Sequence, residues 1–162
     1  MKGTNKVLIA IAVGAILLVG IAIALMLFRP EPTYRSEDSP EGVAHNYLLA
    51  LQKRDYQRAY SYLSESLIGY PPNKTEFITV MHDSWRFRFG SDTSLSVESS
   101  EVWSRRAVVT VRKIRFFRYG LFDSGQRISY FDITLQKNHD QWEIIDAEDY
   151  FAWCWQRTGG CD

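Results

Sequence analysis

The chain has 162 residues, of which 46% are hydrophobic, and it carries 19 basic and 19 acidic residues. Three of the basic residues lie at or before position 29, so the remainder carries 16 basic against 19 acidic residues, a net charge of about −3. A nucleic-acid binder needs a basic face and a positive net charge, and this balance argues against nucleic acid as a partner. Once an apolar N-terminal segment is set aside, the length suffices for one domain and not for two.

Residues 7–28 are an apolar run of 22 residues without a charge, a hydrogen-bonding side chain or a proline. A helix of this length measures about 33 Å, enough to cross a hydrocarbon core about 30 Å thick. We therefore predict a transmembrane helix at residues 7–28. The alternative is a secretory signal peptide, but its apolar region is about 7 to 15 residues long and ends in a small-x-small cleavage site. Residues 25–30, Leu-Met-Leu-Phe-Arg-Pro, do not form such a site.

The flanking charges predict the orientation of this segment. Two lysines precede it without an acidic residue, whereas the arginines beyond it are accompanied by acids at positions 31, 37 and 38. The positive-inside rule then places residues 1–6 in the cytoplasm and the C-terminal domain outside it, in a single-pass protein of the cell membrane. Residues 29–40 contain three prolines, which predicts that residues 29–38 form either an extended stalk of roughly 30 Å or a segment lying along the domain.

Residues 39–162 have the composition of a folded domain that begins with helices. Ser39 precedes a proline, which is typical of a helix start, and apolar residues follow at helical spacing. Asp55 is placed to cap a second helix, and Thr75 to start a third that ends near Gly90. The apolar residues of the three helices are Val43, Ala44, Tyr47, Leu48 and Leu51, then Tyr56, Ala59, Tyr60 and Leu63, then Phe77, Ile78, Met81 and Trp85.

After residue 90 the apolar period changes from helical to alternating. Turn residues separate runs of β-branched and aromatic residues, which predicts four antiparallel strands in a meander. Three helices followed by one sheet are typical of an α+β domain in which the helices cover one sheet face. The alternating residues are Leu95 and Val97, then Ala107, Val109 and Val111, then Phe131, Ile133 and Leu135, then Trp142 and Ile144.

The order of these elements resembles the nuclear transport factor two-like superfamily, whose curved sheet wraps around helices to make a cystatin-like α+β cone. The local sequences that carry the resemblance are residues 39–64, where two helices meet at a charged break, and the strands SRRAVVTVRK and QWEIID. It covers roughly residues 39–150 and implies a small bacterial, membrane-anchored form of the fold. It does not imply one activity, because the cone hosts isomerases, dehydratases and purely interacting domains.

The middle hairpin has a predicted register. With Ser124 and Gly125 as a two-residue loop, Arg118 lies opposite Phe131, and a bulge is expected at residues 112–113. The same register predicts an outer sheet face that could serve a homodimer. Its residues are Phe117, Tyr119, Ile128 and Tyr130 around Arg115.

Two registers remain open for the last hairpin. With residues 139–140 as a two-residue turn, Asp146 and Glu148 face the helices, whereas a three-residue turn puts Ile145 and Ala147 there. The first register buries acids, which costs free energy unless they line a wet cavity. The candidate pocket of that register consists of Arg118, Phe131, Asp146 and Glu148.

Candidate catalytic groups are few. An enzyme of the resembling fold would place His82 or Asp83 at the cone mouth as a general base, but a histidine on a helix is more often a surface residue. His45 is open to the same two interpretations, and His139 is expected in a solvated turn. No metal-ligand spacing, nucleotide-binding loop or nucleophile motif is present. We therefore predict no catalytic residue, no metal and no cofactor.

A basic run at residues 112–118 could form a strip that binds lipid headgroups or cell-wall polyanions. On a strand its charges divide between the two faces, which argues against one strip. We expect acidic residues at positions 140–149 to compensate it.

The C-terminal tail holds both cysteines of the chain, Cys154 and Cys161. Outside the cytoplasm paired thiols usually oxidise, so we predict a disulfide between them. Phe151, Trp153 and Trp155 share one strand face in this tail. They either cap the domain's own core or form a partner surface.

These features together favour a membrane-anchored extracytoplasmic interaction domain, a non-catalytic accessory or scaffold subunit of a membrane protein assembly. Its expected partners are the lipid bilayer through residues 7–28 and either membrane proteins or a second copy. The alternatives are a small-molecule-binding pocket domain and an isomerase- or dehydratase-like enzyme.

Overall fold

The structure is a computed structural model, and it describes residues 2–28, 31–67, 71, 73–83, 92–118, 120 and 123–150. The chain divides into two compact units, Met1–Pro32 and Thr33–Asp162. The boundary falls inside the predicted stalk, so residues 33–38 belong to the second unit.

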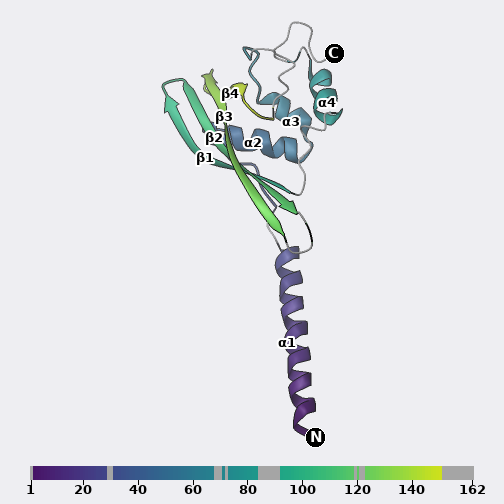
Figure 1. Cartoon of the computed structure of the whole chain (residues 1–162). Coiled ribbons are helices and arrows are strands. Elements are labelled where there is room, and N and C mark those ends of the chain that lie inside the picture. Colours follow the sequence, from purple (N-terminus) through teal and green to yellow (C-terminus); the bar gives the residue numbers. More distant parts are fainter. Residues whose placement is uncertain are drawn as a thin grey trace. The chain divides into compact units, whose positions relative to one another are not determined.

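The first unit contains the helix α1, Lys2–Leu27 (Figure 1). Its described large apolar side chains are mostly exposed, with Ile16 and Leu25 each 71% accessible. Taken over the residues that the structure describes, no helix combines the length and apolar character that a membrane crossing requires. The helical conformation predicted for residues 7–28 is confirmed within α1, while the membrane span itself stays a prediction.

The second unit opens with two capped helices. In α2, Pro40–Gln52, the Ser39 hydroxyl accepts a hydrogen bond from the Gly42 amide at 3.1 Å. In α3, Tyr56–Ser61, the Asp55 carboxylate accepts one from the Arg58 amide at 3.1 Å. Both predicted caps are confirmed, because each side chain satisfies an amide that the first helical turn leaves without a partner.

The third helix of this unit, α4, spans Lys74–Asp83. It starts one residue before Thr75, the predicted start, and is capped by Asn73, whose side-chain oxygen accepts from the Glu76 amide at 2.9 Å. Asparagine is among the residues preferred at this position, because its side-chain oxygen can accept from an amide of the first turn. The expected helical end near Gly90, including Trp85, lies outside the described residues.

The helix α3 is shorter than its apolar pattern predicts, because the residues after it pair with a strand. The Tyr62 carbonyl accepts from the Ile144 amide at 2.8 Å, and the Ser64 amide donates to the Ile144 carbonyl at 2.9 Å. Leu63 thereby forms an isolated parallel bridge with Ile144. The helical spacing of Leu63 still indicates burial correctly, since its side chain is 5% exposed.

Four antiparallel strands follow in the order β1-β2-β3-β4, which confirms the predicted meander and the α+β class. The strands are β1 Thr93–Trp103, β2 Arg106–Arg118, β3 Ser124–Asn138 and β4 Gln141–Ala147. One face of the sheet, here called the inner face, lies against α2 (Figure 1). The buried side chains on it are Ala107, Val109, Val111, Phe131, Ile133, Leu135, Trp142, Ile144 and Ala147.

The predicted register of the middle hairpin is wrong. The structure pairs Val111 with Phe131 and Arg118 with Ser124, so Ser124 and Gly125 belong to β3 and not to the loop. No register shift interrupts the β2–β3 pair at residues 112–113. The irregularity lies on β1 instead, between Val97 and Ser99. The alternation that starts at Ala107 therefore continues unbroken along β2.

The last hairpin combines the two registers that the sequence left open. His139 and Asp140, with φ of 44° and 68°, form a two-residue turn, and Leu135 pairs with Ile144 as the first register requires. A bulge then follows, because Thr134 pairs with Asp146 instead of Ile145. The extra residue reverses the parity, so Ala147 is buried and Asp146 is exposed.

The core lies between the inner face and the helices. Tyr47, Phe77 and Ile133 are each 0% exposed, and the cluster includes every residue of the predicted α2 stripe. The stripe consists of Val43, Ala44, Tyr47, Leu48 and Leu51.

Candidate functional site

The four residues of the predicted pocket do not come together. Phe131 is a core residue at 6% exposure, whereas Arg118 and Asp146 are exposed. The Glu148 carboxylate is also exposed and accepts a hydrogen bond from the Asp132 amide at 3.0 Å. The prediction depended on the first register of the last hairpin, and the bulge after Leu135 and Ile144 turns Asp146 away from the helices. It also placed Arg118 opposite Phe131, and the true register of the middle hairpin puts these two residues on opposite faces of the sheet.

An apolar patch lies on the outer face, the sheet face opposite the helices. Ile114 and Ile128 are direct cross-strand partners, and Phe116 and Tyr130 occupy the same face one pair further along in each direction. The exposed fractions are 49% for Phe116, 47% for Ile128 and 56% for Tyr130. We call these four residues the outer-face patch. Burial of such side chains would release free energy, which makes them a candidate docking surface.

The predicted dimer face is divided between the two sides of the sheet. Ile128 and Tyr130 lie on the outer face, as expected, but Arg115 and Phe117 lie on the inner face. Tyr119 is outside the described residues. Phe116, which the predicted register turned inward, takes their place beside Ile128.

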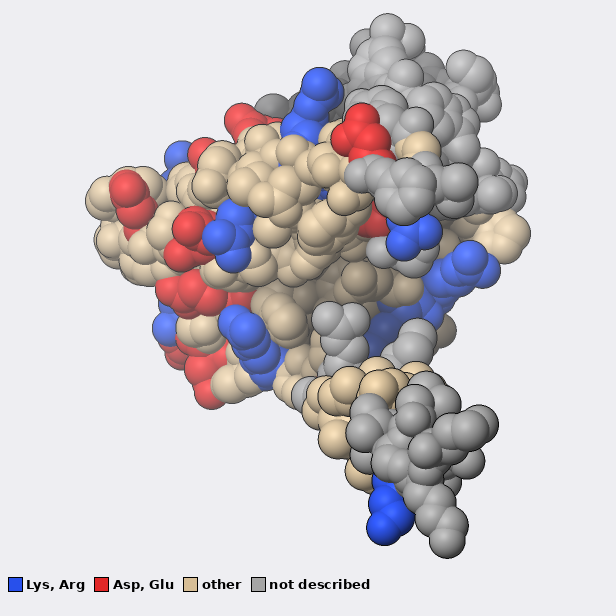
Figure 2. Space-filling view, turned by 60° about the horizontal axis from the view of Figure 1, so that its bottom comes forward, with Lys and Arg blue, Asp and Glu red and all other residues tan. Residues whose placement is uncertain are grey.

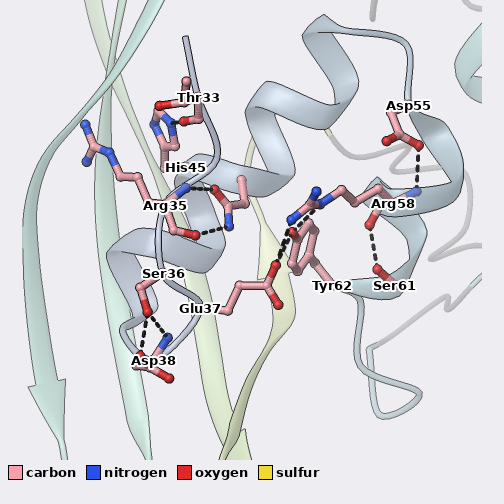
Figure 3. Close-up of polar contacts among 11 residues, drawn as sticks. Thr33, Arg35, Ser36, Glu37, Asp38, His45, Asp55, Arg58, Ser61 and Tyr62 are labelled. Atoms are coloured by element: carbon pink, nitrogen blue, oxygen red, sulfur yellow. Dashed lines mark hydrogen bonds and ion pairs between the residues drawn. The ribbon is translucent and has the colours of Figure 1, made fainter.

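Residues 33–38, the first residues of the second unit, are held against α2 by polar contacts (Figure 3). The Asn46 side chain accepts from the Arg35 amide at 2.8 Å and donates to the Arg35 carbonyl at 2.9 Å. Asn46 is 0% exposed, so both of its bonds replace bonds to water. The His45 ring nitrogen Nε2 lies 3.1 Å from the Thr33 carbonyl oxygen. Residues 33–38 therefore lie along the domain, which is the second of the two predicted arrangements for this segment.

A second set of contacts joins the same segment to α3. The Glu37 carboxylate accepts from the Arg58 guanidinium at 3.0 Å and from the Tyr62 hydroxyl at 2.7 Å (Figure 3). The Arg58 guanidinium also stacks on the Tyr34 ring, 3.6 Å from its centroid. The Arg58 and Glu37 side chains are 38% and 53% exposed, so the free-energy contribution of their ion pair is small, and its role is to fix the path of the chain against the buried Tyr62.

The histidines occupy structural or surface positions. Burial, opposed in part by the hydrogen bond to Thr33, lowers the pKa of His45. His82 is exposed near the end of α4, and the side chain of Asp83 lies outside the described set. His139 is exposed in the β3–β4 turn, as predicted. Among the described residues, no group of three or more histidine, cysteine or acidic side chains is placed to hold a metal ion.

The basic run of β2 is compensated in part, as predicted. Lys113 pairs with Asp149 at 2.6 Å, and Arg112 pairs with Glu98 of β1 at 3.3 Å. On the face shown in Figure 2, acidic and basic side chains are interspersed over the domain. This arrangement argues against a continuous basic strip.

One basic cluster is missed by the sequence analysis. Lys113, Arg115 and Arg127 lie on the inner face beyond the core, together with Ser129, and line one small hollow. The first two come from the basic run, but the third comes from β3. Arg127 lies opposite Arg115 only in the register that the structure shows. The site could have been predicted only if the turn between β2 and β3 had been assigned correctly.

The predicted disulfide and the predicted partner surface lie outside the described residues. They comprise Cys154 and Cys161 for the disulfide and Phe151, Trp153 and Trp155 for the surface. Both stay predictions.

Comparison with known proteins yields structural similarity only. No family model and no curated protein matches the sequence. A SEC-C motif-containing protein from Rhodopseudomonas palustris shares 16% identity at a TM-score of 0.48, covering 72% of this chain and 83% of that one. An NTF2-like protein with a cystatin-like fold from Novosphingobium aromaticivorans shares 15% identity at a TM-score of 0.47, covering 83% and 92%. The association domain of Caenorhabditis elegans CaMKII shares 15% identity at a TM-score of 0.44, covering 64% and 80%.

Several of the similar structures are named as proteins of NTF2-like or cystatin-like fold. Identities of 10–16% and TM-scores below 0.5 do not establish membership of a family.

Proposed function

We propose that this protein is a membrane-anchored extracytoplasmic interaction domain, a non-catalytic accessory or scaffold subunit of a membrane protein assembly. The anchor is the apolar segment at residues 7–28. Its support is the uninterrupted apolar sequence and the 26-residue helix α1 that contains it up to Leu27. The orientation, with residues 1–6 in the cytoplasm, is supported by the lysines that precede the segment.

The domain belongs, in this proposal, to the cone-shaped type of the nuclear transport factor two-like superfamily. The support is the element order, with α2, α3 and α4 before the meander β1–β4. The bulges in β1 and β4 also support it, since bulges bend long strands and curve a sheet around the helices that it covers.

The outer-face patch carries the interaction part of the proposal. Isoleucine and aromatic side chains at about half exposure on an open sheet face are typical of protein-binding surfaces, where aromatic residues are enriched. By contrast, the polar clusters around Asn46 and Glu37 hold residues 33–38 against the helices, so these groups have a structural role. The partner that fits the patch is an apolar protein surface in the same membrane assembly.

The test compares the wild-type full chain, solubilised gently in a neutral detergent, with a double variant of the patch. The double variant is Ile128→Ser with Tyr130→Ser, and the matched control is Trp103→Ser, an aromatic at 55% exposure near the other end of the outer face. Native mass spectrometry reads the composition and stoichiometry of each species, and thermal melting checks the fold. We expect a defined complex for the wild type and the control, and a free chain with unchanged melting for the double variant. A wild-type chain that runs as a single free subunit, or a double variant that keeps its companion, would contradict the proposal.

A further inference from the structure

The inner face changes from apolar to basic where β2 and β3 run past the core. Beyond Phe131, the next two cross-strand pairs on the same face are Lys113 with Ser129 and Arg115 with Arg127. These two pairs line a hollow of about 120 Å³, which we call the basic hollow. It lies on the opposite face of the same strands from the outer-face patch, so it is separate from the proposed docking surface.

The charges of the basic hollow are only partly compensated. Arg115 and Arg127 are direct cross-strand partners, an arrangement in which like charges repel because the Cβ atoms are about 4.5–5.5 Å apart. Among the described residues, neither guanidinium has a carboxylate within ion-pairing distance. Arg127 lies over the Phe117 ring, 6.0 Å from its centroid. Within the part of the chain that the structure describes, these two positive charges therefore face each other without a carboxylate in ion-pairing distance of either.

The third cation of the hollow is held in place from the core side. The Lys113 side chain is 16% exposed, and its ammonium group pairs with Asp149 at 2.6 Å and lies 4.8 Å from the centroid of the Tyr150 ring. Tyr150 is fixed in turn, because its carbonyl accepts from the buried Tyr47 hydroxyl at 2.8 Å and its ring packs on Phe131. The Lys113 side of the hollow is thus held by the core, and a donor that is in place before binding loses less conformational entropy when a ligand arrives.

We propose that the basic hollow binds a small oxyanion, a carboxylate or phosphate group of a soluble ligand. The planar guanidinium groups of Arg115 and Arg127 match the geometry of such a group, and each can donate two hydrogen bonds to it. The Ser129 hydroxyl and the Lys113 ammonium supply further donors. A volume of about 120 Å³ holds one such group, so the rest of the ligand projects into solvent. This site is additional to the docking role proposed for the outer-face patch, and its test does not depend on that role.

The test uses the full chain in a neutral detergent. Sodium phosphate and sodium acetate are titrated in separate series at constant ionic strength set with chloride, and the unfolding midpoint is followed. A ligand that binds only the folded state raises the midpoint with a saturable dependence on its concentration. We expect such a rise for at least one anion; a response to phosphate alone assigns a phosphate ligand, and a response to acetate alone assigns a carboxylate.

Three variants separate a built site from charge screening. Arg127→Gln is expected to weaken the apparent affinity by about tenfold or more, since it removes the charge-assisted hydrogen bonds of one guanidinium. Arg127→Lys keeps the charge but loses the planar fork, and we expect a similar loss. Arg106→Gln, on the outer face of β2, is the control and leaves the response unchanged.

The same three variants also show whether a substitution has damaged the fold. Without added oxyanion, Arg127→Gln should melt at the wild-type temperature or above it, because the variant removes a like-charge pair. A wild-type midpoint that does not respond saturably to either anion would overturn the proposal. So would an undiminished response in Arg127→Gln or in Arg127→Lys.

Discussion

The Tyr47 hydroxyl, in the middle of α2, donates a 2.8 Å hydrogen bond to the backbone carbonyl of Tyr150, 103 positions later in the chain. The bond ties the first helix of the domain to the chain after β4, and both residues are buried. Burial raises the pKa of the Tyr47 phenol, so the hydroxyl remains a neutral donor at every physiological pH.

Replacement of this donor tests the link. Tyr47→Phe keeps the ring but removes the buried hydroxyl that donates to the Tyr150 carbonyl, and we expect a loss of about 1–3 kcal/mol in unfolding free energy. Chemical denaturation of the full chain in detergent measures it. Tyr130→Phe removes an exposed hydroxyl and should stay within about 0.5 kcal/mol of the wild type. Equal effects of the two substitutions would mean that the Tyr47 bond is not formed.

Asn46→Ala tests whether residues 33–38 are held against α2. The variant leaves the amide and carbonyl of Arg35 without their partners, and we expect a destabilisation of about 2 kcal/mol. Trypsin should then cut after Arg35 faster than in the wild type, because the segment is released. Asn138→Ala, in an exposed position next to the β3–β4 turn, is the control. Wild-type cleavage kinetics in Asn46→Ala would show that other contacts hold the segment.

Gly42→Ala gives an independent test of the same packing. In most helix interiors this substitution stabilises by about 1 kcal/mol. Here a Cβ atom at Gly42 would overlap the Ser36 carbonyl oxygen, so we expect a destabilisation of about 1–3 kcal/mol instead. Gly125→Ala meets open space and should be neutral or slightly stabilising. A more stable Gly42→Ala protein would mean that the Ser36 backbone does not lie over α2.

The pH dependence of stability should include a contribution from His45. Burial lowers its folded-state pKa below the ordinary histidine value of 6.5. As the pH falls below that value, the unfolded chain therefore takes up the proton first, and stability decreases until the folded-state pKa is passed. Above pH 6.5 the contribution is constant.

His45→Gln keeps a donor toward Thr33 and does not titrate, so its stability should fall less than that of the wild type between about pH 7.5 and about pH 5. His139→Asn, in the exposed turn, should follow the wild-type curve, since asparagine tolerates a positive φ. Urea midpoints across this range provide the comparison. Identical pH curves for the wild type and His45→Gln would exclude His45 as the titrating group.

The sequence predicts the fold where one physical signal acts alone. Ser39 and Asp55 cap helices because their side chains satisfy local amides, and the buried stripe around Tyr47 follows from helical spacing. Register is harder, because a slip of one residue exchanges the faces of a strand. Ser124 and Gly125 have turn chemistry, yet they lie in β3, and the mistaken turn placed Arg118 on the same face as Phe131 in the predicted pocket.

The last hairpin shows why the candidate sites could be predicted only in part. Turn chemistry identifies residues 139–140, but the bulge at Ile145 is set by the packing of Ile144 and Ala147 together on the inner face. The basic hollow likewise depends on the partner of Arg115. Its identity is a property of strand pairing over many residues and not of the local sequence.

The claim on which the proposed function depends most is that residues 7–28 anchor the chain and that the domain lies outside the cytoplasm. Protease protection in spheroplasts that express the full chain, followed by alkaline extraction of the membranes, tests it directly. We predict that external protease removes the domain while a cytoplasmic marker stays intact, and that the N-terminal fragment remains in the extracted membrane. A domain that is protected until the spheroplasts are lysed, or a chain that alkaline extraction releases into the soluble fraction, would contradict the claim.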